Sequence, residues 1–186
     1  KKEVLEYLDP KPGENFIDAT LGFGGHAEAI LEKIAPNGKV LGIEWDEEVY
    51  KKITPRERLI LINDSYANLK KIVEENKFGP VNGILFDLGI SSWDLEGSGR
   101  GFTFAKDEPL DMRFNPKGIL TAEKIVNTWQ EKEIAQIIWE YGEERFSRVI
   151  AKRIIEKRKI KPIETTFNLI ALIPTRTNPA KTFQAL

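Results

Sequence analysis

Four short apolar runs, separated by polar or amphipathic stretches, organise the first half of the chain. Each run ends at a turn or a polar cluster, as β-strands do. The runs span residues 15–19, 39–45, 58–63 and 81–88. Between the first two, apolar side chains recur at the i, i+3, i+4 and i+7 spacing of a helix with one buried face: Ala27, Ile30, Leu31 and Ile34. This alternation predicts an α/β fold with a parallel, doubly wound sheet.

The pattern changes after about Asp107. From there on, no run has the pattern of a strand, and the apolar residues follow helical spacing over 121–128, 130–141 and 143–159. We therefore expect a helical insertion or second domain to follow the sheet.

The amino-acid composition excludes several classes of protein and of metal site. The 186 residues include no Cys and a single His, which excludes disulfides and thiolate metal sites and leaves no histidine cluster for a metal. Neither a signal peptide nor an apolar run of membrane-spanning length is present, so we expect a cytoplasmic protein with no membrane partner. The chain does not start with Met, so an N-terminal piece could be missing.

The formal net charge of −1 hides an asymmetry along the chain. Residues 1–141 carry 18 Lys and Arg against 25 Asp and Glu, whereas residues 142–186 carry 10 against 4. A basic segment behind an acidic body predicts that the C-terminal part contacts a polyanion.

A glycine-rich turn between the first strand and the first helix is the first candidate binding feature. Residues 22–27 read Gly-x-Gly-x-x-Ala, which lets a ligand approach the backbone and the N–H groups at the helix start. Glu44 follows about 20 residues later, at the end of the second predicted strand, where it could accept hydrogen bonds from a ribose. The pattern alone is weak, because these glycines could form only a tight turn and Glu44 could only cap a strand.

Two acids help to choose between the possible nucleotides. Asp18 and Asp87 end the first and fourth predicted strands, which flank the point where open α/β sheets bind ligands. Carboxylates there would repel the pyrophosphate of NAD and attract the sulfonium and ammonium of S-adenosylmethionine. The acids favour S-adenosylmethionine, with an NAD-linked oxidoreductase as the alternative, although either acid alone could be a surface or capping carboxylate.

Six sequence blocks then follow one another in a specific order. They are Asp18-Ala-Thr-Leu-Gly-Phe-Gly-Gly-His26, Asp87-Leu-Gly-Ile-Ser-Ser92, Arg100-Gly-Phe-Thr-Phe104, Pro109-Leu-Asp-Met-Arg113, Tyr141-Gly-Glu-Glu-Arg-Phe146 and Thr182-Phe-Gln-Ala-Leu186. In this order the chain resembles the bacterial 16S rRNA (cytosine-N(4))-methyltransferases. The resemblance implies a Rossmann-like class I methyltransferase that methylates the exocyclic 4-amino group of a cytosine in the decoding region of 16S rRNA.

The resemblance also implies a domain plan. It places an S-adenosylmethionine-binding Rossmann-like domain at 1–106, a helical insertion that binds RNA at 107–174, and a return to the methyltransferase domain at 175–186. Members of the family continue with three more strands beyond the last block, so we expect C-terminal strands to be missing from this chain. The implied partner is 16S rRNA within the small ribosomal subunit.

Cofactor contacts are carried over from the same blocks. Glu44 stands where Asp is common, which preserves the carboxylate, whereas Asp94 stands where Gln is usual, and His26 is expected to touch the cofactor through its backbone. The residues implied to bind S-adenosylmethionine are Gly24, Gly25, His26, Glu44, Tyr66, Asp87 and Asp94.

The chemistry needs an amine held in line with the sulfonium methyl, and no covalent intermediate. The amine of cytosine is a poor nucleophile, so an acceptor for its protons should help, and Asp87 and Asp111 are the candidate catalytic carboxylates. A flipped base would also need aromatic neighbours, for which Trp93, Phe102 and Phe104 are candidates. The alternative for Phe102 and Phe104 is a loop that packs on its own domain.

The basic C-terminal part has the pattern of an amphipathic helix. Apolar and cationic residues fall on separate faces, with Phe146, Val149, Ile150 and Ile154 on one and Arg145, Arg148, Lys152 and Lys159 on the other. We identify Arg145, Arg148 and Lys152 as candidate RNA-binding residues. The alternatives are an ordinary solvated face for the stripe and, for the whole protein, a non-catalytic RNA-binding assembly factor.

Overall fold

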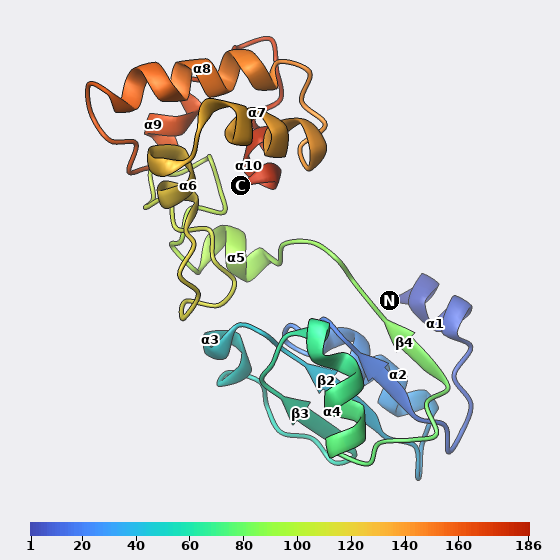
Figure 1. Ribbon diagram of the computed structural model, residues 1–186. Coiled ribbons are helices and arrows are strands. Elements are labelled where there is room, and N and C mark those ends of the chain that lie inside the picture. The colour runs from blue at the N-terminus through green and yellow to red at the C-terminus, as the bar shows by residue number, and fades with distance from the viewer. The chain divides into compact units, whose positions relative to one another are not determined.

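The computed structural model describes residues 1–186 and separates into two compact units, Lys1–Gly89 and Ile90–Leu186. Figure 1 shows the sheet in the first unit, and helices and loops in the second. The three domains predicted from the sequence are not tested by this division and stay a prediction.

A four-stranded parallel sheet forms the centre of the first unit. Its strands are β1 (Phe16–Asp18), β2 (Val40–Ile43), β3 (Leu59–Ile62) and β4 (Gly83–Leu85). They lie in the order β3-β2-β1-β4, and every neighbouring pair is parallel. The predicted parallel α/β fold is therefore confirmed, and each strand falls inside its predicted run. Because the chain returns from the β3 edge to the far side of β1, the strand order reverses between β1 and β4, the position at which such sheets bind ligands.

Alternate residues of each strand serve opposite faces of the sheet. Phe16 and Val40 belong to one hydrophobic cluster, whereas their neighbours Ile17 and Leu41 belong to another. The helices cover both faces, because α1 and α2 pack into the first cluster and α4 into the second. The helices of this unit are α1 (Lys2–Leu8), α2 (Gly25–Lys33), α3 (Glu47–Tyr50), the 3₁₀ turn η1 (Tyr66–Asn68) and α4 (Leu69–Glu75).

The second unit contains helices and loops, as the change of pattern after Asp107 predicts. No strand forms among its residues, and one isolated antiparallel bridge joins Pro109 to Thr165. Its helices are α5 (Ser92–Glu96), α6 (Ala122–Thr128), α7 (Glu131–Glu140), α8 (Ser147–Arg158), α9 (Thr166–Ile170) and α10 (Pro179–Ala185). None of the helices in either unit is long and apolar enough to cross a membrane.

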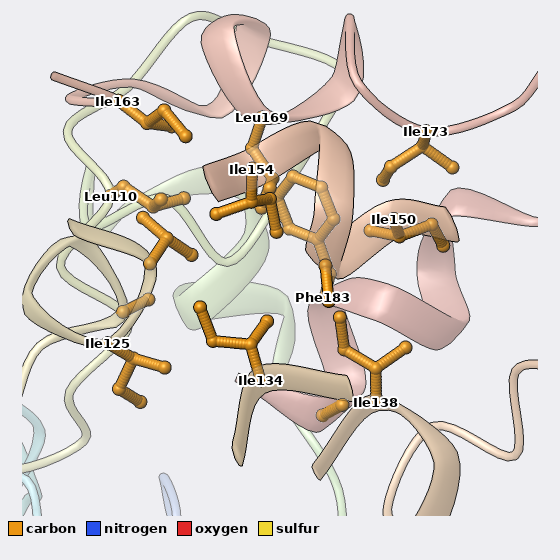
Figure 2. Packing of buried hydrophobic residues seen from close by; sticks show 14 residues of the cluster. Leu110, Ile125, Ile134, Ile138, Ile150, Ile154, Ile163, Leu169, Ile173 and Phe183 are labelled. Atoms are coloured by element: carbon orange, nitrogen blue, oxygen red, sulfur yellow. The ribbon is translucent and has the colours of Figure 1, made fainter. Parts of the chain in front are cut away.

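An isoleucine-rich core holds these helices together. Figure 2 shows Ile134 and Ile138 of α7 directed toward Ile150 and Ile154 of α8, and all four side chains are fully buried. Leu110, Leu169 and Phe183 are among the other members of the cluster and come from loops and helices distant in the sequence.

The prediction for α8 is wrong in two respects. The helix begins at Ser147 rather than at Glu143, because Glu143 takes a left-handed conformation with φ 50° and the chain turns before the helix starts. Val149 is also not on the buried face, since 42% of it is exposed. The buried positions Ser147, Ile150, Ala151 and Ile154 form their own i, i+3, i+4, i+7 stripe, and Val149 lies beside that stripe.

Candidate active site

The glycine turn links the end of β1 to the start of α2. Gly22 and Gly24 have positive φ values of 54° and 80°, which residues with a Cβ rarely adopt. Gly24 is also the N-cap of α2, and no side chain caps this helix. The N–H groups of Gly25 and His26 are therefore available to a ligand, whereas the N–H of Ala27 is directed to the Asp18 carboxylate.

Glu44 braces this turn from the end of β2. One carboxylate oxygen accepts a hydrogen bond from the N–H of Gly22 at 2.8 Å, and the other accepts one from the N–H of Asp46 at 2.7 Å. The carboxylate thus lies beside the glycine turn, as the sequence predicts, and also stabilises it. Its contact with a ribose stays a prediction.

Asp18 is a buried acid at the end of β1. Its Oδ1 accepts a hydrogen bond from the N–H of Thr20 at 3.3 Å, whereas its Oδ2 is buried without a hydrogen-bond partner. Burial raises the pKa of Asp18 to about 6, and the charges of Asp87 and Glu44 add to the rise. The backbone N–H groups of Thr20 and Ala27 offset part of it. An unpartnered buried carboxylate oxygen is costly to the fold, so a cation that reached it would be stabilised there.

Asp87 follows β4 and faces His26 from the first turn of α2. The His26 Nε2 lies 3.4 Å from the Asp87 Oδ2, and the N–H of Asp87 donates to the hydroxyl oxygen of Thr20 at 2.8 Å. The Asp87 side chain is 66% exposed, so a substrate can reach it. Asp87 therefore lies at the same edge of the sheet as the glycine turn and Asp18.

An aromatic pair stands at this end of the sheet. The rings of Tyr66 and Phe86 meet edge to face with centroids 5.7 Å apart, and both residues are 44% exposed. The resemblance implied that Tyr66 binds the cofactor, whereas Phe86 was missed. The available signal was its position, because Phe86 directly precedes Asp87 where β4 leaves the sheet.

The remaining predicted cofactor residue, Asp94, belongs to the second unit. It is buried, and its Oδ2 accepts bonds from both the N–H and the hydroxyl of Ser91 at 2.7 Å. These bonds form a capping box at the start of α5. The carboxylate thus has a local structural role, and its predicted contact with a cofactor stays a prediction.

Asp111, the second candidate acceptor, is held by a cation. The Arg113 guanidinium donates to both carboxylate oxygens, and this pairing lowers the pKa of Asp111. Arg113 also donates to the carbonyl oxygens of Pro116 and Gly118. The pair therefore shapes the loop after the short bridge.

The aromatic residues proposed to contact a base pack within the second unit. Phe102 is buried with its ring 5.0 Å from that of Phe114, and the ring of Phe104 lies 5.5 Å from that of Phe183. These contacts agree with the alternative that the loop packs on its own domain. Trp93, in α5, lies over Gly97, where an added Cβ would come within 2.5 Å of the ring.

The three candidate RNA-binding residues are all exposed. Arg145 and Arg148 line a groove of about 810 Å³ between α7 and the start of α8, together with Lys132, Ala135, Gln136 and Trp139 of α7. We call this the α7–α8 groove. Lys152 does not line it and lies 3.9 Å from Glu156 on its own helix. The structure thus places Arg145 and Arg148 in the same groove, and Lys152 outside it.

The whole chain is similar to known proteins. The family model described as the MraW methylase family matches residues 1–186. A ribosomal RNA small subunit methyltransferase H from Dictyoglomus thermophilum is 44% identical over 199 residues, covering 100% of this chain and 66% of that protein. The protein of the same name from Dehalococcoides mccartyi strain BAV1 is also 44% identical, over 100% of this chain and 56% of its own length. The chain therefore spans less than two thirds of these relatives.

Solved structures match as well. A putative rRNA methylase from Clostridium thermocellum is 24% identical, with a TM-score of 0.42 over 48% of this chain and 50% of that one.

Proposed function

Because the chain belongs to the MraW methylase family, as its sequence blocks predict, we propose that its protein is an S-adenosylmethionine-dependent rRNA methyltransferase. The substrate is the exocyclic 4-amino group of a cytosine in the decoding region of 16S rRNA. The names of the relatives, which refer to the small ribosomal subunit, support this choice of RNA. Such an enzyme acts in the cytoplasm, on rRNA or on the assembling subunit.

One observation carries the choice of cofactor. The buried Asp18 Oδ2 has no partner and lies at the sheet edge that also holds Glu44 and Asp87. A pyrophosphate would meet three carboxylates there, whereas the positive methionine end of S-adenosylmethionine would be attracted to them. The residues present thus fit S-adenosylmethionine, and they do not favour NAD.

The parts of the site suit the parts of that cofactor. Tyr66 and Phe86 offer exposed ring faces to the adenine, and the Glu44 carboxylate is the acceptor for the ribose hydroxyls. The glycine turn and the open start of α2 receive the methionine part, with Asp18 as its charge partner.

When bound, S-adenosylmethionine supplies an electrophilic methyl group on a positively charged sulfur. The protein's own task is to hold the cytosine amine in line with that methyl and to accept the amine proton. Asp87 is better suited than Asp111 to accept it, because both oxygens of Asp111 are already bonded to Arg113. The proton then resides on the Asp87 carboxylate, next to the His26 Nε2.

Transfer of tritiated methyl groups to small ribosomal subunits that lack the modification tests the proposal. We expect label in 16S rRNA at the cytosine N4 atom, and loss of labelling with the Asp87→Asn variant. Titration calorimetry with S-adenosylmethionine and with NAD runs beside it and should show binding of the first only. Preference for NAD would favour an oxidoreductase, and RNA binding without methyl transfer would favour the assembly factor.

A further inference from the structure

Helix α7 has one face in the core and another that lines the α7–α8 groove. Ile134 and Ile138 point into the core, whereas Lys132, Ala135, Gln136 and Trp139 line the α7–α8 groove at the i, i+3, i+4 and i+7 positions. Ala135 is small, so the backbone of α7 can be approached beside the large indole of Trp139. Of these four residues only Ala135 also packs against the core, so Lys132, Gln136 and Trp139 are not held in the groove by core packing.

Trp139 is 59% exposed, although it is one of the largest apolar side chains in the unit. Single exposed apolar residues are common on protein surfaces and need no explanation by themselves. This one, however, lines a groove that Arg145 and Arg148 also line. An open aromatic face next to guanidinium groups is the arrangement that single-stranded nucleic acid binders use.

The charges of the groove are uneven. Lys132, Arg145 and Arg148 line it against a single acid, Glu131. The guanidinium groups of Arg145 and Arg148 form no hydrogen bond or ion pair within the chain. Two unpaired guanidinium groups on one groove favour an anionic occupant with charges at more than one point.

We propose that the α7–α8 groove binds an unstacked nucleotide in a single-stranded segment of the substrate RNA. Trp139 stacks on its base, and Arg145 and Arg148 contact the flanking phosphates. The inference rests on the proposed function for the identity of the RNA. A duplex is disfavoured because its bases present no free face to the indole, and an acidic peptide would use the arginines without needing Trp139.

The proposal divides the basic residues of α8. Arg148 lines the groove and has no partner, whereas Lys152, one turn further along, lies outside it and near Glu156. Lys152 is therefore a matched control on the same helix. We expect the predicted RNA-binding set to reduce to Arg145 and Arg148.

Fluorescence anisotropy of a labelled single-stranded RNA of about 12 nucleotides tests the groove in the whole chain. We expect Trp139→Ala to weaken binding about five- to hundredfold, the range found for loss of one stacked base, and Trp139→Phe to keep most of the affinity. Arg148→Gln should lower the slope of log affinity against log salt by about 0.7, and Lys152→Gln should leave it unchanged.

Several results would overturn the proposal. They are a wild-type chain that does not bind the oligonucleotide, equal affinities of wild type and Trp139→Ala, and equal effects of Arg148→Gln and Lys152→Gln. A polyglutamate peptide that competes as well as unlabelled RNA would also do so. Unfolding midpoints of all variants are compared, and Arg148→Gln keeps the test decisive if Trp139→Ala is unstable.

Cofactor binding separates this inference from the proposed function. The groove variants should bind S-adenosylmethionine as the wild type does, because the cofactor residues of the first unit are untouched. If small subunits are methylated while Trp139→Ala leaves RNA affinity unchanged, the groove proposal fails and the enzyme assignment stands. If RNA binding depends on Trp139 but no methyl transfer occurs, the enzyme assignment fails instead.

Discussion

Each unit contains an aspartate with a shifted pKa, and the two pKa values are shifted in opposite directions. In the sheet unit, Asp18 is buried with one oxygen unpartnered, and its pKa is raised to about 6. In the helical unit, Asp111 is paired with Arg113, and its pKa is lowered. The first acid keeps one oxygen without a hydrogen-bond partner, for which we propose a cationic ligand, and the second is bonded within its own loop. A residue type and its burial therefore do not identify a site, because the partners decide whether a carboxylate is available.

The largest expected effect separates the two candidate proton acceptors. Asp87→Asn should lower the rate of methyl transfer by about 10²–10⁴, as expected when a general base is lost. Asp111→Asn should change the rate by less than about tenfold, because Asp111 is bonded to Arg113. Single-turnover transfer of tritiated methyl groups at saturating cofactor measures both. A larger loss with Asp111→Asn would reverse the assignment.

Asp18 should impose a pH dependence on stability. Its folded-state pKa of about 6 exceeds its ordinary value of 3.8, so the folded protein holds the proton more tightly than the unfolded chain. The resulting penalty is absent below about pH 4, grows as pH rises to about 6, and is complete above it, at about 3 kcal/mol. Asp18→Asn should thus match the wild type near pH 4 and exceed its unfolding free energy near pH 7.

Urea unfolding of both proteins at several pH values, followed by circular dichroism, gives the difference directly. Contributions from carboxylates that do not interact with Asp18 cancel in the comparison, whereas those of Asp87 and Glu44 change with it. Parallel pH profiles for wild type and Asp18→Asn would show that Asp18 is not the strained acid described here.

The paired acid should instead stabilise its unit. Arg113→Met removes the partner of Asp111 and the bonds to two loop carbonyls, so the unfolding free energy should fall by about 2 kcal/mol. Lys124→Met, an exposed cation on α6, is the control and should change it by less than about 0.5 kcal/mol. Similar losses for the two variants in urea unfolding would show that the pair contributes no special stability.

Glu44 lies between the two extremes, since it braces the glycine turn and is also expected to bind a ligand. Glu44→Ala should weaken S-adenosylmethionine binding by at least about tenfold, through lost charged hydrogen bonds to the ribose and a looser turn. Calorimetric titration measures the affinity. Adenosine, which keeps the ribose but lacks the methionine part, should lose a similar factor, and unchanged affinity for both ligands would exclude the ribose contact.

Local patterns in the sequence determined the elements and the location of the turn. The strands fall inside the four apolar runs, and α2 begins at the glycines, because the spacing of buried residues and the φ values of glycine depend on near neighbours. The sequence blocks likewise identified the family across the whole chain. The exposure of Val149 was missed because the direction of α8 is chosen by the core it packs against, including residues such as Ile163 and Phe183.

Only the tertiary structure decided which side chains are partners. Glu44 reaches the N–H of Gly22, Phe86 meets Tyr66, and Trp139 shares a groove with Arg148, in each case across a gap in the sequence that periodicity does not span. The same holds for Asp18. Its position at the end of a strand could be predicted from the sequence, whereas its raised pKa follows from burial and from the acids Asp87 and Glu44, which follow β4 and β2. Electrostatic free energy depends on distances and desolvation, which the chain sets only when the strands assemble side by side.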